Sequence, residues 1–381
     1  MNKTLNYFKS QPHQPFFALA VINAILFMLV FLLSFKGVIT LSINPLSFHA
    51  YSLIFLVFTP AFLGFLLTTF PRFSQTPAID KKEYMGIFYA LLTGVVLFII
   101  GSFLGGFWLL LSKIAVLVAQ AYAMLIFFNI YKASPIKDKH DQFYIMIAWG
   151  SGIVSNLLFM LDFRAIVGAE VLIGVYLYLI FLALSIAQRM VPFFTHVMVD
   201  RNENLLKIIF GLFSLMVVFE VLDLKIGFFF LLASGALLLK EMIRWKLPWK
   251  SNEPIIWILH LAIYWLPMAL IFGGFSKLGE LIFEKSFLSL HIHLVVLGFL
   301  TTILIGFGTR VTIGHSGNQM VIDKYTKIVF YLTQIVIYFR IIYSFSGSSM
   351  LFDITSALWM GLFLAWGWKY LPTLVSGKKL N

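Results

Sequence analysis

Two histidines separated by one residue, His291 and His293, open the tenth apolar segment of the chain. An imidazole inside a bilayer is costly to bury, so histidines at such positions are functional candidates by default. The imidazole titrates near neutral pH, and either ring nitrogen can bind a metal. This pair is therefore the starting point for a metal or haem site.

A third histidine, His49, begins the second apolar segment, and the topology derived below puts all three at the same outer depth. Residues two apart on an α-helix point about 200° from each other, so His291 and His293 must serve different sites. Two neutral imidazoles from different helices suit the axial coordination of a b-type haem, and His49 could pair with one of the two. The alternatives are a headgroup contact for His49 and an interhelical hydrogen bond for His291 or His293.

Three further polar residues lie within predicted spans. Arg340, near the outer end of its span, either extends to lipid headgroups or binds a haem propionate. Lys113 has a similar depth and the same two interpretations. His260 lies near the cytoplasmic end of its span, whereas His49 lies at the outer end, so the two cannot share a haem. His260 is either a ligand of a second metal or a structural hydrogen-bonding group.

The remaining histidines lie where an imidazole is cheap to accommodate. His13, His196 and His315 are expected at the cytoplasmic surface, and His140 in a charged loop. For these four we expect no role in a metal site.

A membrane-spanning bundle must position these residues. The chain has 381 residues, of which 61% are hydrophobic and 12% charged, and its mean hydropathy of +0.95 excludes a soluble domain. There is no cysteine, which excludes disulfides, thiolate ligands and iron–sulfur clusters. Any metal must therefore be held by His, Met or carboxylate oxygen.

Breaks at charged and Pro/Gly clusters predict an all-α, polytopic membrane protein with about twelve transmembrane helices. The helices are expected to form a single transmembrane domain over residues 1–381. The predicted spans are 15–36, 47–70, 84–104, 107–131, 142–162, 167–190, 204–223, 226–244, 254–274, 287–309, 325–345 and 349–371.

Loop charge predicts the orientation of these spans. With a cytoplasmic N-terminus, 21 of the 28 Lys and Arg residues lie on the cytoplasmic side and five on the other. The positive-inside rule then places both termini in the cytoplasm. The net charge of +12 is spread over short loops, so the lipid bilayer is the expected partner and nucleic acid is not.

Acidic residues are missing from the middle of the predicted spans. Glu170, Glu220 and Asp353 all lie at outer ends. Proton-coupled transporters and pumps usually need a carboxylate inside the membrane, so this class is disfavoured.

Several segments, in order along the chain, closely resemble the NnrS family of membrane haem proteins, which act in bacterial responses to nitric oxide and are reported to carry copper. The run 309–317, T-R-V-T-I-G-H-S-G, resembles the family signature T-R-x-T-L-G-H-T-G. His293 with Gly298 fits the preceding H-x-x-x-x-G, and the run from Trp257 through His260 to Pro267 resembles the ninth helix. Similar stretches are P-H-Q-P-F-F at 12–17, G-F-L-L-T at 64–68 and P-F-F-T at 192–195.

One position departs from the family pattern. Where the family typically shows H-A-H-E, this chain reads His49-Ala50-Tyr51-Ser52, so the second histidine and the acid are missing. If that second histidine binds copper in relatives, copper loses a ligand here. Tyr51 would then be a weak substitute ligand or a hydrogen-bonding group.

A second resemblance is to subunit I of the haem–copper oxidases. It rests on His49 followed by Pro60 and Gly64, and on the His291-x-His293 pair. The resemblance implies an oxidase-like fold in which His49 and His293 bind a low-spin haem b and His291 a second haem. The copper histidines of those oxidases have no counterpart in spans six and seven, which argues against oxygen reduction with proton pumping.

Three functions follow as hypotheses. The first is an NnrS-like haem protein of the inner membrane that relieves nitrosative stress by binding or turning over nitric oxide, another diatomic gas or their metal-nitrosyl products. The second is an enzyme, a reduced relative of oxidases and nitric-oxide reductases that takes electrons from a quinol or a cytochrome. The third is a transporter for a small solute or a metal, which is expected if no haem copurifies.

Overall fold

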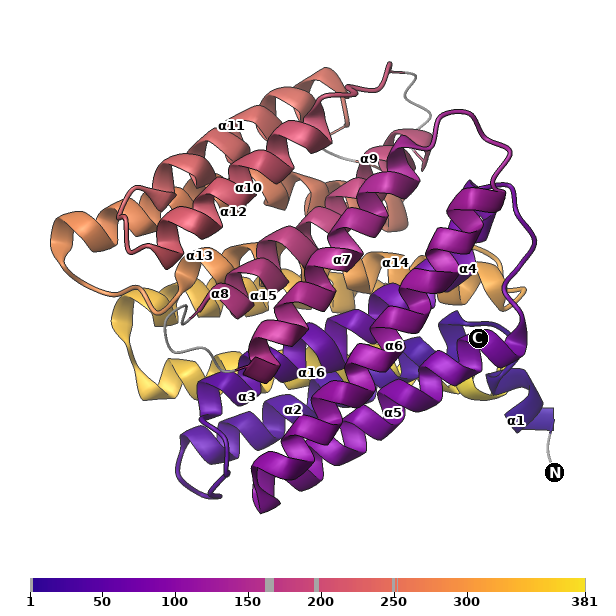
Figure 1. Cartoon of the computed structure of the whole chain (residues 1–381), viewed down its shortest axis with the longest axis horizontal. Coiled ribbons are helices and arrows are strands. Elements are labelled where there is room, and N and C mark those ends of the chain that lie inside the picture. The colour runs from indigo at the N-terminus through magenta and orange to yellow at the C-terminus, as the bar shows by residue number, and fades with distance from the viewer. Residues whose placement is uncertain (1–2, 162–167, 195–198, 249–250, 252, 381) are drawn as a thin grey trace. The chain divides into compact units, whose positions relative to one another are not determined.

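Helices make up the secondary structure of the described residues, in which there is no strand. The structure is a computed structural model that describes residues 3–161, 168–194, 199–248, 251 and 253–380 (Figure 1). In these residues ten segments are long and apolar enough to cross a bilayer. They are His13–Phe35, Pro45–Phe73, Lys81–Leu104, Gly106–Ala133, His140–Leu161, Ala169–Met190, Pro254–Phe283, Leu290–His315, Lys324–Ser346 and Ser349–Ser376. The chain is thus an all-helical, multi-pass membrane protein.

Two of the twelve predicted spans are not among these ten segments. The predicted spans 204–223 and 226–244 correspond to α10 (Leu205–Val221), of 17 residues, and α11 (Gly227–Arg244), of 18 residues. Both are helices, but they are short for a membrane of ordinary thickness. Whether these two helices span the membrane therefore stays a prediction.

The first of two compact units contains residues 1–165, 311–320 and 359–381. Its helices are α1 (Lys3–Phe8), α2 (His13–Phe35), α3 (Pro45–Tyr51), α4 (Thr59–Phe73), α5 (Lys81–Leu104), α6 (Gly106–Ala133) and α7 (His140–Leu161), with the π-helix η1 (Ser52–Phe58) between α3 and α4. Helices α5 and α6 lie side by side (Figure 1). They approach closely because Gly94 and Gly101 leave room for Val116 and Leu109.

The second unit contains residues 166–310 and 321–358. It comprises α8 (Ala169–Leu172), η3 (Ile173–Ile180), α9 (Phe181–Phe194), α10, α11, α12 (Pro254–Phe283), α13 (Leu290–His293), η4 (Leu294–Thr301) and α15 (Lys324–Ser346), together with the parts of α14 (Thr302–His315) and α16 (Ser349–Ser376) that lie in these residues. Small residues again set the packing: a Cβ on Gly235 or Gly274 would meet α12 or α11 atoms within 2.8 Å.

Three spans contain a π-helical stretch, η1, η3 and η4, directly after a short α-helix. A π-turn leaves a carbonyl without its usual donor, and side chains compensate here. The Thr59 and Thr301 hydroxyls donate to the carbonyls five residues earlier, of Ile54 and Val296. Pro60 lacks an N–H for Leu56, whose carbonyl accepts from Asn23 at 2.6 Å instead. Such stretches often mark functional sites, and two of them follow the predicted histidines.

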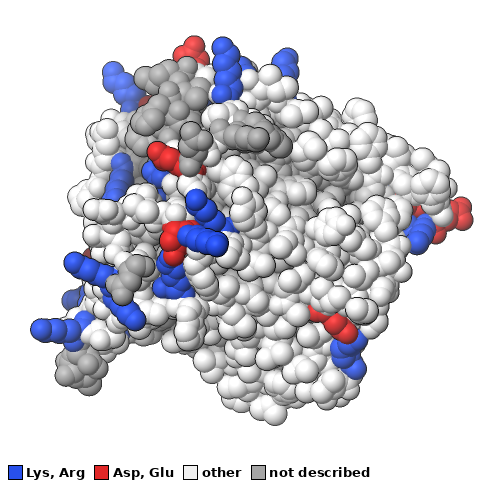
Figure 2. Space-filling model, turned by 180° about the vertical axis from the view of Figure 1, so that it is seen from behind, with Lys and Arg blue, Asp and Glu red and all other residues white. Residues whose placement is uncertain are grey.

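The distribution of charge on the surface fits a membrane environment. On the face drawn in Figure 2, most of the surface is uncharged, and the Lys, Arg, Asp and Glu side chains lie in separate clusters. Many apolar side chains are exposed, among them Trp368 at 82%, Phe283 at 71% and Leu104 at 70%. In water such a surface would aggregate, whereas in lipid it is the expected exterior.

Candidate functional site

His49 lies in the first unit, on α3, just before η1. The Asn44 side chain caps this short helix by accepting from the backbone N–H groups of Leu46 and Ser47. The half-buried imidazole of His49 stacks on the ring of Phe31, with centroids 4.3 Å apart. The stacking holds the ring plane without using a ring nitrogen.

Tyr51, which replaces the second histidine of the family motif, is fully buried. Its hydroxyl donates to Asn156 Oδ1 at 3.2 Å, and Asn156 Nδ2 donates to Gln120 Oε1 at 2.9 Å. Its ring stacks on Phe98. Of the two roles expected for Tyr51, the geometry matches that of a hydrogen-bonding group. Nearby, the Lys113 ammonium donates to the Phe159 carbonyl at 2.5 Å, so it has a partner inside the unit.

His291 and His293 have different neighbours in the second unit, as their two-residue spacing predicts. His291 is 8% exposed and faces α12, where only a glycine, Gly273, leaves room for its Cβ. The Tyr176 hydroxyl donates to the His291 carbonyl at 3.3 Å. The imidazole of His293 lies beside Arg340 of α15. The two residues therefore pack against different helices, His291 through its Cα and Cβ against α12 and His293 through its ring against α15.

The His293 ring is oriented by its own helix. Its Nδ1 lies 2.9 Å from the Ser289 carbonyl, to which an Nδ1–H would donate, and 3.0 Å from Arg340 Nη2, from which a bare Nδ1 would accept. In the tautomer that donates to the carbonyl, the lone pair is on Nε2, which is how a metal-binding histidine is usually held. The His293 side chain is half-buried.

Arg340 is only 6% exposed and lies next to this imidazole. Its Nη2 donates to the Leu288 carbonyl at 2.6 Å and lies 3.0 Å from His293 Nδ1, and its Nη1 donates to the Ser344 hydroxyl. Among the described residues it forms no ion pair with a carboxylate. A buried guanidinium without a counter-ion is costly, and an anionic group of a bound ligand would lower that cost.

A glycine and a tryptophan fix the helix that carries His293. Gly298, five residues after His293, allows the Trp265 indole of α12 to approach: a Cβ there would lie 2.7 Å from the indole and 2.9 Å from Ile337. The Trp265 N–H donates to Gln334 Oε1 at 2.7 Å. This contact joins α12, η4 and α15 immediately behind the histidine.

His260 is 1% exposed and has one nitrogen in use. Its Nδ1 lies 3.0 Å from the Pro248 carbonyl, and its buried Nε2 has no hydrogen-bond partner among the described residues. The same holds for Nδ1 of buried His291. Both observations suit neutral imidazoles with a nitrogen left for a metal.

These features fit a haem better than a metal held by several protein ligands. The described residues contain no group of three or more His, Asp or Glu side chains close enough to share one ion. A haem can be held by one or two imidazoles, and a cation can pair with its propionates. His293 and Arg340 supply this combination within one unit.

Sequence reasoning missed one pair of residues. His13 and His315, expected separately at the surface, lie together in the first unit with ring centroids 4.8 Å apart. Both belong to the family-like segments 12–17 and 309–317, and this shared membership was the signal that could have found them. His196 lies outside the described residues.

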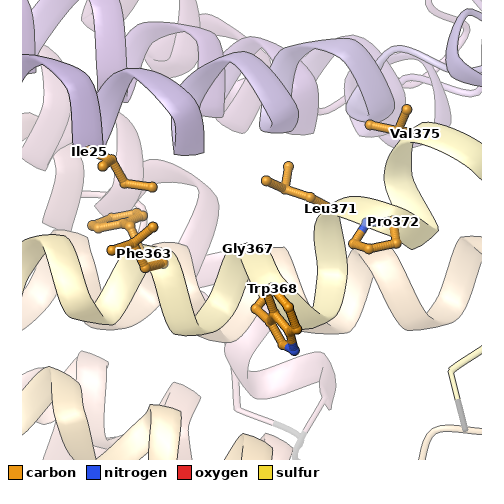
Figure 3. A pocket seen from close by; sticks show the side chains of 8 residues that line it. Ile25, Phe363, Gly367, Trp368, Leu371, Pro372 and Val375 are labelled. Carbon is orange, nitrogen blue, oxygen red and sulfur yellow. The ribbon is translucent and has the colours of Figure 1, made fainter.

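One groove in the first unit lacks polar groups for chemistry. It has a volume of about 390 Å³ and runs between α2 and α16, lined by apolar side chains such as Ile25, Phe363 and Leu371 (Figure 3). Its lining suits a lipid chain, not a reacting substrate.

Among known proteins, no curated protein matches the chain. The family model described as "NnrS protein" matches residues 7–378, which is nearly the full length. The chain therefore belongs to the NnrS family.

Proposed function

We propose that this protein binds haem b in the bacterial inner membrane and acts in the response to nitric oxide. The observation that carries the proposal is the buried Arg340, which has no carboxylate partner in the described residues and touches the oriented imidazole of His293. Membership of the NnrS family supports the link to nitric oxide. The positive-inside rule supports cytoplasmic termini.

The residues have distinct roles in this proposal. A haem, when bound, supplies an iron that exchanges one electron and binds diatomic gases. His293 would offer Nε2 as a ligand in the tautomer whose Nδ1–H donates to the Ser289 carbonyl. Arg340 pairs with a propionate. His49 would be a further ligand of the haem iron, as the sequence predicts.

His291 supports a second site. Its buried Nδ1 has no hydrogen-bond partner in the described part of the chain, and its Cβ packs against Gly273 of α12. A second haem ligated there would leave a coordination position for nitric oxide. Electron supply from a quinol or a cytochrome would then make the protein an enzyme, whereas without a donor it would bind or sense the gas.

The visible spectrum of the detergent-purified protein tests the proposal. We expect a Soret band and a sharp reduced α-band in the wild type. His49→Ala and His293→Ala should each abolish the α-band, while His140→Ala, which alters a histidine outside the site, should preserve it. A wild-type protein without a Soret band would refute haem binding and favour the transporter, and unchanged spectra in both ligand variants would refute the ligand assignment.

A further inference from the structure

Two histidines from opposite ends of the chain meet in the first unit. His13 is the first residue of α2, and His315 is the last residue of α14. Their ring centroids are 4.8 Å apart, and the ring planes are inclined by 44°. His13 is 2% exposed, and His315 is half-buried. One ring is therefore sealed in the protein while the other is reachable from outside.

The buried ring has an unused nitrogen. His13 Nδ1 has no hydrogen-bond partner among the described residues. The adjacent Gln14 amide oxygen cannot serve, because it already accepts from the Ser10 hydroxyl and the Gln11 N–H, both at 2.9 Å. A buried polar nitrogen without a partner is costly in proteins, so a bound partner at this nitrogen is expected.

The separation of the rings suits a shared metal ion. An imidazole nitrogen binds zinc at about 2.0–2.1 Å, which places the ring centre roughly 3.2 Å from the ion. Two ring centres 4.8 Å apart then subtend about 97° at the metal, close to the tetrahedral angle. Linear two-coordination would need ring centres about 6.4 Å apart and is excluded by the same arithmetic.

We propose that His13 and His315 form a two-imidazole site for a divalent transition-metal ion of the class that imidazole prefers, such as Zn²⁺. The other coordination positions are open to water or a small anion. The positive charge of Arg72 acts on both rings, so it disfavours a bare cation and favours an anion on the bound metal. Arg72 is exposed, so solvent weakens its repulsion of the ion.

Zinc binding by the full-length protein tests this site. The detergent-purified protein is treated with EDTA, desalted, incubated with one equivalent of ZnSO₄ and desalted again, and the zinc per chain is measured by elemental mass spectrometry. We expect about one zinc in the wild type, and a loss of zinc affinity of at least about 100-fold in His13→Gln and in His315→Gln, since removing an outer-shell partner alone costs up to that factor. His140→Gln, a histidine of the same unit outside the pair, should bind zinc like the wild type.

The zinc content of the variants distinguishes a metal site from a plain contact between two rings. Equal zinc in the wild type and both pair variants would overturn the proposal and leave a tilted aromatic contact, as would no zinc in the wild type. His315→Gln carries the test if the buried His13→Gln fails to fold, which gel filtration reports. His293→Ala should keep its zinc, and His315→Gln should keep its Soret band, so failure of the haem proposal and failure of the zinc proposal are distinguishable.

Discussion

Replacing Gly298 with alanine should destabilise the second unit and lower its haem content. A Cβ at this position would lie 2.7 Å from Trp265 and 2.9 Å from Ile337. Carbon atoms prefer separations of at least about 3.5 Å, so these side chains must retreat by roughly 0.6–0.8 Å. Trp265 cannot retreat freely, because its N–H is bound to Gln334 at 2.7 Å.

The expected magnitude follows from these contacts. Overpacking typically costs about 1–3 kcal/mol, and loss of the Trp265–Gln334 hydrogen bond adds about 1 kcal/mol. The total is about 2–4 kcal/mol. For 381 residues the unfolding entropy is roughly 0.8 kcal/mol/K, so the Tm should fall by about 2.5–5 °C.

Thermal unfolding in detergent, followed by tryptophan fluorescence, measures this change, and a pyridine haemochrome assay measures haem per chain. Gly211→Ala is the matched control, because it lies in a helix of the same unit with no atom within 4 Å of the added Cβ. The control should keep its Tm within about 1 °C, as expected of a substitution away from packed contacts. If both variants unfold at the same temperature with equal haem, the close contact at Gly298 does not hold the His293 helix.

Three other results are expected. Arg340→Gln should lower the haem midpoint potential by on the order of 50 mV in a spectroelectrochemical titration, because a nearby cation favours the reduced iron. Arg340→Lys, which retains the positive charge, should keep a potential close to that of the wild type. Equal potentials in all three proteins would contradict the role of the charge. His291→Ala should remove the Soret shift that carbon monoxide causes in the reduced protein and spare the low-spin band, and a persistent shift would make His291 structural. A reporter active only in the periplasm, fused after Asn381, should be silent, and strong activity would reverse the topology.

The helical segments were largely predictable, because hydropathy reports the property that makes a segment span a bilayer. The predicted span 15–36 is His13–Phe35 in the structure, and 84–104 is Lys81–Leu104. Helices are also present at the predicted spans 204–223 and 226–244, as α10 and α11, but they are short, so their crossing of the membrane stays a prediction. The predicted orientation does not depend on them, because omitting two consecutive crossings leaves the side of every other loop unchanged.

The site was predictable only in part. Depth along the helices correctly suggested that Arg340 could act near a histidine, and the structure puts it 3.0 Å from His293. Depth alone could not select His293 over His291, since this depends on how α13 is rotated between α12 and α15. The contact between His13 and His315 joins residues from opposite ends of the chain, and no local pattern encodes such a contact.

The π-helix η4 has a consequence for insertions and deletions in this protein. Each hydrogen-bonded turn of a π-helix contains one more residue than a turn of an α-helix. Removing one residue from η4 could therefore be absorbed by conversion to α-helix, whereas a deletion inside a regular helix such as α15 rotates everything beyond it by about 100°. Deletion of one residue should therefore be tolerated within residues 294–301 and not within α15. The π segment thus allows the position of His293 relative to the rest of its helix to change without loss of the fold.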